Sequence, residues 1–224
     1  MRDLLVILPV RGRPDSARRF MKAFRETATA ATDVALITDE DDTSSSGLSG
    51  ELDVMGMTLV RVPTAQKINK AADACAGSYE ALMFMGDDNV PLTPGWDGFL
   101  LDALGGCGMA FANDLSPHAG LLPCSVMMSS AIVRALGWMA LPGCSHFFID
   151  NAWREIGQRA GCLTYLPGVV IDHLHPVWGK GQMDELYASA RPMYWDHDEA
   201  AFHCWVAGRM DADVATVAAL REGA

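Results

Sequence analysis

Two adjacent carboxylates, Asp87 and Asp88, follow an apolar run at residues 81–85 and precede a turn that contains two prolines. Like charges at this spacing repel, and apolar surroundings raise the free-energy cost of ionising either group. Divalent cations such as Mg²⁺ and Mn²⁺ favour oxygen ligands and commonly combine one or two carboxylates with substrate phosphates. The pair therefore predicts either a divalent-cation site or an ordinary polar turn, in which Asp and Asn are frequent.

A second candidate is the pair of histidines in the segment VVIDHLHP at residues 169–176. Residues two apart on a strand share a face, so His173 and His175 are expected to point the same way. Such a pair suits a transition metal, and one imidazole could complete a site made of carboxylates and phosphate. The alternative is a pair of hydrogen-bonded histidines near the end of a strand.

Two further side chains could take part in chemistry. Asp150 lies where a loop enters an amphipathic segment at residues 147–161, so it is either a helix N-cap or a general base. Lys180 stands between two glycines and could fold over a phosphate, although lysines are more often solvated at the surface. The chain contains no P-loop, dinucleotide-binding glycine fingerprint or Gly-x-Ser-x-Gly elbow, which argues against kinases, GTPases, dehydrogenases and serine hydrolases.

The elements that would position these residues alternate regularly in the first half. Apolar or β-rich runs predict strands at residues 3–9, 34–42, 54–62 and 81–85, and amphipathic stretches predict helices at 14–29 and 65–76. This order is typical of a mostly parallel sheet covered on both faces. Ligands of open α/β sheets bind beyond the carboxyl ends of the strands, so residues 9–13, 39–42 and 87–88 are expected to line one crevice.

The second half is less regular. We expect a helix at residues 95–104, a strand at 108–114, a strand leading into a helix at 124–137, a helix at 147–161 and two short strands within 163–175. Residues 44–50 read as a flexible loop, and the tail from about residue 184 is expected to be helical. The sequence contains no repeat and no linker, which favours a single α/β domain.

The composition restricts the class of protein. Half of the 224 residues are hydrophobic, the formal net charge is −11 and the pI is about 4.8, so broad nucleic-acid binding is not expected. The chain has no apolar run long enough to span a membrane, and Pro9 interrupts the apolar N-terminus, so we expect a cytoplasmic protein. The six scattered cysteines are expected to be core thiols.

The order of the motifs is more specific than any one of them. ILPVRGRPD, ITDEDD, MFMGDDNVP, FFIDNAWREIGQRAG and VVIDHLHP follow one another between about residues 4 and 180. In this order they resemble a glycosyltransferase of the A-type fold, close to the family-2 inverting enzymes. The resemblance implies a Rossmann-like nucleotide-binding sheet flanked by helices over residues 1–183. Its donor half would end near residue 90, its acceptor half would be 91–183, and residues 184–224 would be a helical extension packed on it.

The resemblance also implies a set of residues that bind the nucleotide-sugar donor. Pro9, Val10 and Arg11 would line the base and ribose pocket, and Asp39 would contact the base. The full predicted donor-binding set is Pro9, Val10, Arg11, Arg13, Asp39, Lys67, Asn69, Asp87 and Lys180.

The metal and the catalytic base follow from the same alignment of motifs. MFMGDDNVP places Gly86 at the first position of the family's Asp-x-Asp pattern and Asp88 at the second. Asp88 would hold the metal, and Asp87 would be a neighbouring contact. Asp150 matches the family's catalytic aspartate, with Ile149 in place of the preceding glutamate. The late histidine that reaches the metal or diphosphate corresponds to His173 or His175, of which His173 is preferred.

The resulting prediction is a metal-dependent inverting glycosyltransferase that uses Mn²⁺ or Mg²⁺ and a nucleoside-diphosphate sugar. Asp150 would deprotonate an acceptor hydroxyl on a small molecule, a protein or a modified nucleobase. The acceptor side would come from residues 111–128 and 138–148. Four alternatives stay open: a non-catalytic nucleotide-sugar binding protein, a nucleotidyltransferase, a zinc hydrolase that uses the histidines and Asp88, and a purely structural protein.

Overall fold

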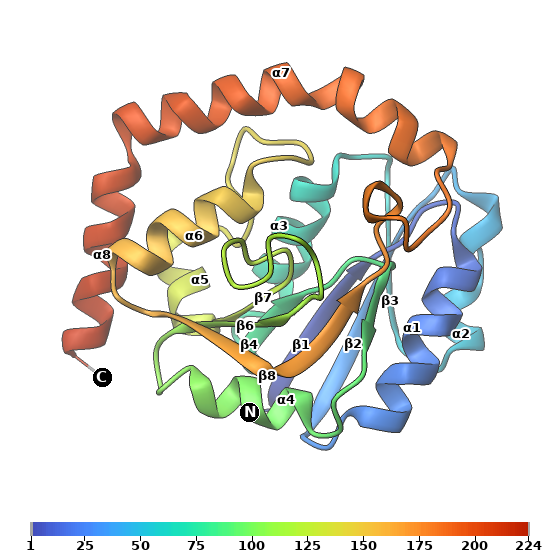
Figure 1. The fold of residues 1–224 in the computed structure, drawn as a ribbon, viewed down its shortest axis with the longest axis horizontal. Coiled ribbons are helices and arrows are strands. Elements are labelled where there is room, and N and C mark those ends of the chain that lie inside the picture. Colours follow the sequence, from blue (N-terminus) through green and yellow to red (C-terminus); the bar gives the residue numbers. More distant parts are fainter. Residues whose placement is uncertain (1, 224) are drawn as a thin grey trace.

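Figure 1 shows the computed structural model of the protein, which describes residues 2–223. The strands are β1 (Arg2–Pro9), β2 (Thr32–Asp39), β3 (Met55–Leu59), β4 (Tyr79–Phe84), β5 (Asn89–Pro91), β6 (Met109–Asn113), β7 (Val126–Ser129) and β8 (Leu163–His173). The helices are α1 (Pro14–Thr27), α2 (Leu48–Glu51), α3 (Thr64–Cys75), α4 (Trp96–Ala103), α5 (Ser130–Leu136), α6 (Ile149–Arg159), α7 (Glu185–Gly208) and α8 (Met210–Glu222). Short 3-10 helices lie at Thr43–Ser45 and Pro176–Trp178. The strands form one sheet in the order β3-β2-β1-β4-β7-β6-β8-β5.

The first half of the chain has the predicted alternation of strands and helices. Strands β3, β2, β1 and β4 are all parallel, and residues 4–8 of β1 are fully buried. Successive side chains of a strand point to opposite faces. Leu5 and Ile7 therefore pack in the core that contains Ile68 of α3, whereas Leu4 and Val6 pack in the core that contains Phe20 of α1.

The second half makes the sheet mixed. Strand β7 runs antiparallel to both β4 and β6, β8 is parallel to β6, and β5 is antiparallel to β8. The prediction of two short strands within 163–175 is wrong, because β8 is one strand of eleven residues. The Pro167–Gly168 pair suggests from the sequence that a strand ends there. In the structure the pair lies at a register shift opposite Ala112 and Asn113 of β6. Such an irregularity lets a strand bend without ending.

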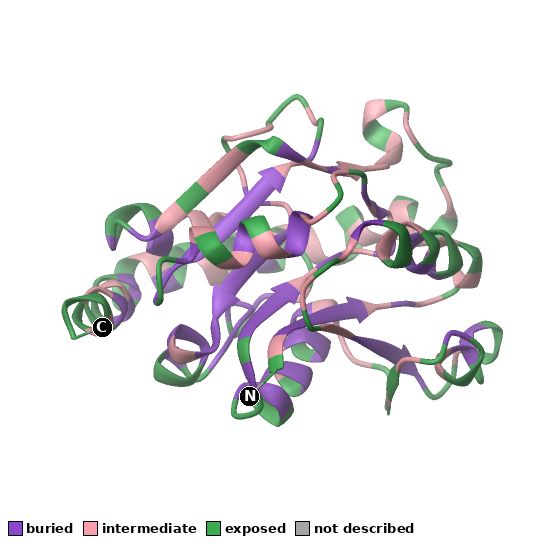
Figure 2. Cartoon of the chain, turned by 90° about the horizontal axis from the view of Figure 1, so that it is seen from below, coloured by how far each residue is buried: buried purple, intermediate pink, exposed green. Residues whose placement is uncertain are grey.

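The strands at the centre of the sheet are largely buried (Figure 2). Strand β3 is an edge strand whose residues are exposed or half-buried. Residues 44–50, which the sequence predicts to be a flexible loop, instead contain a 3-10 turn and the short helix α2. Across residues 2–223 we find no helix with the length and apolar character of a membrane span.

The predicted helical tail is confirmed, and it is hydrogen-bonded to the loop that leads into α6. Helix α7 arches over the upper edge of the molecule in Figure 1, and α8 follows it back against α5 and α6. Pro192 lies inside α7. The fully buried Asp198 of α7 accepts hydrogen bonds of 2.8 Å from the backbone N–H groups of residues 145, 146 and 147. One side chain thus connects α7 to the loop that leads into α6.

We expect Asp198→Ala to lower the free energy of unfolding by about 3 kcal/mol, because three backbone N–H donors would lose a buried, charged acceptor. Urea denaturation monitored by tryptophan fluorescence measures this loss. Asp196→Ala removes an exposed carboxylate from the same helix and is expected to change stability by less than about 0.5 kcal/mol. Equal effects of the two substitutions would contradict the anchoring role of Asp198.

Candidate active site

A pocket of about 350 Å³ lies beyond the carboxyl ends of β1, β2 and β4. This volume is in the range of small-molecule binding sites. Eleven of the thirteen site residues predicted from the sequence line it, and they are Pro9, Val10, Arg11, Arg13, Asp39, Lys67, Asp87, Asp88, Asp150, His173 and His175. The structure thus brings together segments that are separated by more than 160 residues in the chain.

Asn69 and Lys180 are the two predicted residues that do not line the pocket. The side chain of Asn69 donates to the carbonyl of Ala140 and accepts from the N–H groups of Met139 and Ala140, so it anchors that loop. The Lys180 ammonium donates to Asp172 at 2.5 Å and to the carbonyl of Leu115 at 3.0 Å. A contact of Lys180 with phosphate stays a prediction, since it would require this ammonium to leave both partners.

At one end of the pocket a buried ion pair surrounds Asp39, the last residue of β2. Oδ2 of Asp39 accepts from Lys67 Nζ at 2.6 Å and from Arg11 at 2.9 Å. Arg11 also makes two hydrogen bonds to Asp41. Oδ1 of Asp39 is buried and has no hydrogen-bond partner among the described residues. An unpaired buried carboxylate oxygen is costly, so this atom is suited to accept a hydrogen bond from a bound ligand.

The two adjacent carboxylates have different surroundings. Burial and the charge of Asp88 raise the pKa of Asp87 to about 7, although Arg13 lies 3.5 Å away. Burial also opposes ionisation of Asp88, yet hydrogen bonds from His173 (3.1 Å) and from the Tyr187 hydroxyl (2.5 Å) hold its pKa well below the ordinary value. Asp88 is therefore the ionised member of the pair.

The position of the Asp88 carboxylate explains why residue 86, the first of the predicted Asp-x-Asp pattern, is a glycine. A Cβ atom at this position would lie 2.5 Å from Oδ1 of Asp88, which is closer than real Cβ contacts allow. Oδ1 of Asp88 thus occupies the space above the Gly86 backbone. A side chain at position 86 would require the Asp88 carboxylate to move.

The two histidines have separate roles in the structure. His173 ends β8, and its Nε2 atom is the one that contacts Asp88. His175 lies beyond the strand, where Nδ1 accepts a hydrogen bond from the N–H of Val177. Its ring packs 5.0 Å from the ring of Tyr187. His173 is therefore the histidine in direct contact with Asp88.

Asp150 lies in the first turn of α6 and lines the pocket. The N-cap alternative for Asp150 is wrong, because Phe148 occupies the N-cap with a left-handed φ of 62°. The Asp150 side chain accepts from the adjacent N–H of Asn151, at 2.9 Å. Burial raises its pKa above the ordinary carboxyl value. A more basic carboxylate that faces a pocket is suited to remove a proton.

Helix α7 supplies site residues that the sequence motifs did not reveal. Asp184, the N-cap of α7, holds Arg13 by two hydrogen bonds of 2.6 and 2.7 Å. The Arg13 guanidinium lies 3.8 Å from the centre of the Tyr187 ring. Further along the helix, Met193 and Tyr194 line the pocket opposite Phe147. The aromatic residues of the tail are the signal in the sequence that could have indicated these contacts.

The prediction that the cysteines are core thiols is correct for four of the six. Cys75, Cys107, Cys144 and Cys162 are buried, whereas Cys204 is exposed. Cys124 is half-buried and lines the pocket. Its position follows from the loop that precedes β7, a part of the chain whose fold the sequence predicted less well.

Comparison with solved structures places this fold in a known class. The protein has the A-type fold of glycosyltransferases, and its sheet and helices superpose on several of them. Glucosyl-3-phosphoglycerate synthase from Mycobacterium tuberculosis, solved with Mn²⁺, UDP-glucose and phosphoglyceric acid, matches with a TM-score of 0.62 and 12% identity. The match covers 90% of this chain and 78% of that one.

Two other solved structures extend the comparison. A mannosyltransferase from Pyrobaculum calidifontis, in complex with GDP-mannose and Mn²⁺, matches with a TM-score of 0.56 and 12% identity over 98% of this chain and 82% of its own. S. aureus TarS matches with a TM-score of 0.58 and 10% identity over 75% of this chain, which spans only 36% of the TarS length. No protein-family profile and no curated protein sequence matches the chain. At these identities the likeness establishes the fold.

Proposed function

We propose that the protein is a metal-dependent inverting glycosyltransferase that moves a sugar from a nucleoside diphosphate to an acceptor hydroxyl. The observation that carries this proposal is one pocket with three distinct parts. These are an unpaired carboxylate oxygen on Asp39, an ionised Asp88 in contact with His173, and a weakly acidic Asp150. The first suits a nucleobase, the second a metal-bound diphosphate, and the third an acceptor hydroxyl.

The nucleobase end is supported by the geometry of Asp39. Its Oδ2 atom is fixed by Lys67 and Arg11, so the carboxylate cannot rotate freely, and Oδ1 is left to accept a hydrogen bond. Uracil and guanine each present a ring N–H donor, whereas adenine and cytosine place an unprotonated ring nitrogen, which repels a carboxylate, beside their amino donor. A carboxylate therefore favours UDP or GDP as the nucleotide portion of the donor.

The residues around Asp88 suit a hard divalent cation. Asp88 and His173 offer an ionised oxygen and an imidazole nitrogen within 3.1 Å of each other, and a cation there would also relieve the repulsion between Asp87 and Asp88. Asp88 and His173 would hold Mn²⁺ or Mg²⁺, which when bound neutralises the diphosphate and makes it a better leaving group. The Tyr187 hydroxyl would have to yield its 2.5 Å contact with Asp88.

Asp150 then acts as the general base. Its carboxylate accepts the proton of the acceptor hydroxyl as that oxygen attacks the anomeric carbon, and the bond from this carbon to the diphosphate oxygen breaks with its electron pair. Attack from the face opposite the leaving group inverts the anomeric carbon. Arg13 lies beside Asp87 and supplies positive charge in the same pocket. Phe147, Met193 and Tyr194 form the apolar wall against which the acceptor would rest.

A thermal-shift series tests the proposal directly. With Mn²⁺ present, UDP or GDP at about 100 times its Kd should stabilise the fold by about 2.7 kcal/mol, which corresponds to a rise in Tm of about 5–10 °C. ADP and CDP provide the matched controls for the nucleobase, and omission of Mn²⁺ provides the control for the metal. Failure of every nucleoside diphosphate to raise the Tm in the presence of Mn²⁺ would refute the proposal.

The other functions predict different results in the same experiment. A non-catalytic nucleotide-sugar binding protein would show the stabilisation without hydrolysis or transfer of the donor sugar. A zinc hydrolase would turn over its substrate without binding a nucleotide-sugar, and a nucleotidyltransferase would be stabilised by nucleoside triphosphates. The acceptor and a cytoplasmic location stay predictions from the sequence.

A further inference from the structure

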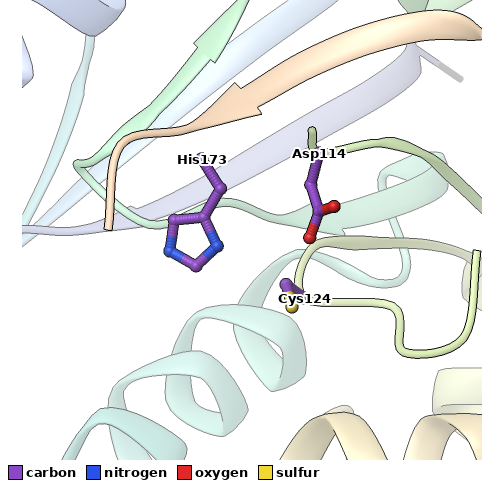
Figure 3. A group of neighbouring side chains, drawn as sticks. All are labelled: Asp114, Cys124 and His173. Carbon is purple, nitrogen blue, oxygen red and sulfur yellow. The ribbon is translucent and has the colours of Figure 1, made fainter. Parts of the chain in front are cut away.

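His173 also belongs to a second group of side chains that could hold a metal ion. Figure 3 shows this group, which consists of Asp114, Cys124 and His173. Asp114 follows the end of β6, Cys124 precedes β7, and His173 ends β8, so three strands of the second half of the sheet bring them together. One ligand atom from each residue lies within 4.8 Å of the others. In Figure 3 the ring of His173 and the carboxylate of Asp114 are turned toward the same space above Cys124.

Two atoms of this group are buried and unsatisfied. Oδ2 of Asp114 and Nδ1 of His173 have no hydrogen-bond partner among residues 2–223. Asp114 is only 4% exposed, and its other oxygen accepts from the N–H of Ser116 at 3.0 Å. A buried carboxylate oxygen without a partner carries a large desolvation cost unless a cation or a donor reaches it.

The contact with Asp88 determines which atom of His173 is free. Because the ionised carboxylate of Asp88 can only accept, Nε2 of His173 carries the proton in that contact. In the neutral ring, Nδ1 then presents a lone pair toward Asp114 and Cys124. The backbone holds this arrangement, since the N–H of His173 donates to the carbonyl of Asp114 at 3.1 Å. The Cys124 thiol lies within hydrogen-bonding reach of Asp114, so its deprotonation would leave three electron-pair donors facing the same space.

We propose that Asp114, Cys124 and Nδ1 of His173 form a binding site for a thiophilic divalent cation of the zinc class, separate from the cation site on Asp88. A thiolate, an imidazole and a carboxylate are the ligands that Zn²⁺ takes in proteins, and three protein ligands leave a fourth position open to water. Mg²⁺ does not share this preference for sulfur. In tetrahedral zinc sites ligand atoms lie roughly 3.5 Å apart, so the loops must close by about 1 Å.

The binding step involves a proton and leaves His173 shared between two sites. Cys124 coordinates as a thiolate, so binding of Zn²⁺ forms the sulfur–metal bond and releases the thiol proton to solvent. Burial and the nearby carboxylates raise the pKa of this thiol when no cation is present. If His173 also binds the cation on Asp88, the proton on Nε2 must leave to solvent as that cation binds, and the ring then connects the two sites as an imidazolate. Zinc bound at Nδ1 would fix the ring orientation that Asp88 requires at Nε2.

Metal binding by the intact protein tests this proposal independently of any transferase activity. Equilibrium dialysis against Zn²⁺ with millimolar Mg²⁺ present should give one tightly bound zinc per chain, and Co²⁺ should show a thiolate-to-metal charge-transfer band. Asp114→Asn and Cys124→Ala should each weaken zinc binding at least 10-fold. Cys107→Ser alters a buried thiol outside this cluster and serves as the matched control.

Two results would overturn the proposal. The first is a wild-type protein whose Co²⁺ complex has no thiolate band, a result that does not depend on the folding of any variant. The second is zinc binding that is lost in Asp88→Ala but unchanged in Cys124→Ala, which would place zinc on the Asp88 site. The absence of nucleotide binding would refute the proposed transferase function and leave this zinc site unaffected.

Discussion

Asp150→Asn is expected to lower kcat for sugar transfer by about 10²–10⁴-fold while leaving nucleotide binding intact. The substitution preserves the shape of the side chain, but an amide cannot accept a proton as an ionised carboxylate does. Asp150 accepts the N–H of Asn151, and the amide oxygen of Asn can keep that contact, so α6 should be unaffected. Initial rates with saturating donor, together with the donor-induced rise in Tm, separate the two effects.

A pH profile adds a signature that a structural role would not produce. Burial raises the pKa of Asp150 above the ordinary carboxyl value, and the base works only when ionised. The wild-type rate should therefore fall as the pH drops through this raised pKa, and the residual rate of Asp150→Asn should lack that limb. Glu155→Gln removes a carboxylate from the same helix outside the pocket and should behave as wild type. Transfer at the wild-type rate by Asp150→Asn would show that another group is the base.

Asp88→Asn is expected to abolish the dependence of nucleotide binding on Mn²⁺ and to lower transfer about 100-fold or more. The amide keeps the size of the side chain but loses the charge that a cation requires. Asp88 also accepts the hydroxyl of Tyr187 and Nε2 of His173, so the variant can lose stability without any ligand. The Tm of each variant without nucleotide must therefore be subtracted before the effects of Mn²⁺ are compared.

Asp87→Asn is the matched control because it alters the neighbouring carboxylate, whose charge is already suppressed. Burial and the charge of Asp88 raise the pKa of Asp87 to about 7, so this group contributes less than a full charge near neutral pH. We expect Asp87→Asn to retain the Mn²⁺-dependent rise in Tm. If the two substitutions had equal effects, Asp88 would not be the principal ligand.

The sequence predicted the parallel strands of the first half because both faces of the central strands are covered. Burial on both faces leaves a continuous apolar run, as in residues 4–8, and a polar residue marks the end of each such strand. Parallel strands end at one edge, so Asp39, Asp87 and Asp88 could be placed together before the structure was known. Strand β5 has three residues, too few for any periodic pattern, and its pairing with β8 could not be predicted.

The remaining site residues depend on contacts between distant segments. Tyr187 reaches Asp88 across 99 positions, and Asp184 reaches Arg13 across 171. No sequence motif contains Tyr187 or Asp184, because each residue meets its partner only through the path that the chain takes over the pocket. The Asp114–Cys124–His173 cluster has the same origin. Its members meet because β8 is parallel to β6 and β7 is antiparallel to it, so the ends of β6 and β8 lie beside the start of β7.

Pro192 divides α7 into two segments that differ mechanically. Proline has no N–H to donate to the carbonyl four residues earlier, at Ala188, so the helix bends most easily at this point. The segment before it carries Tyr187, and the segment after it is held by Asp198. The two segments of α7 are therefore anchored independently, the first by the side chains of the pocket and the second by the loop that leads into α6.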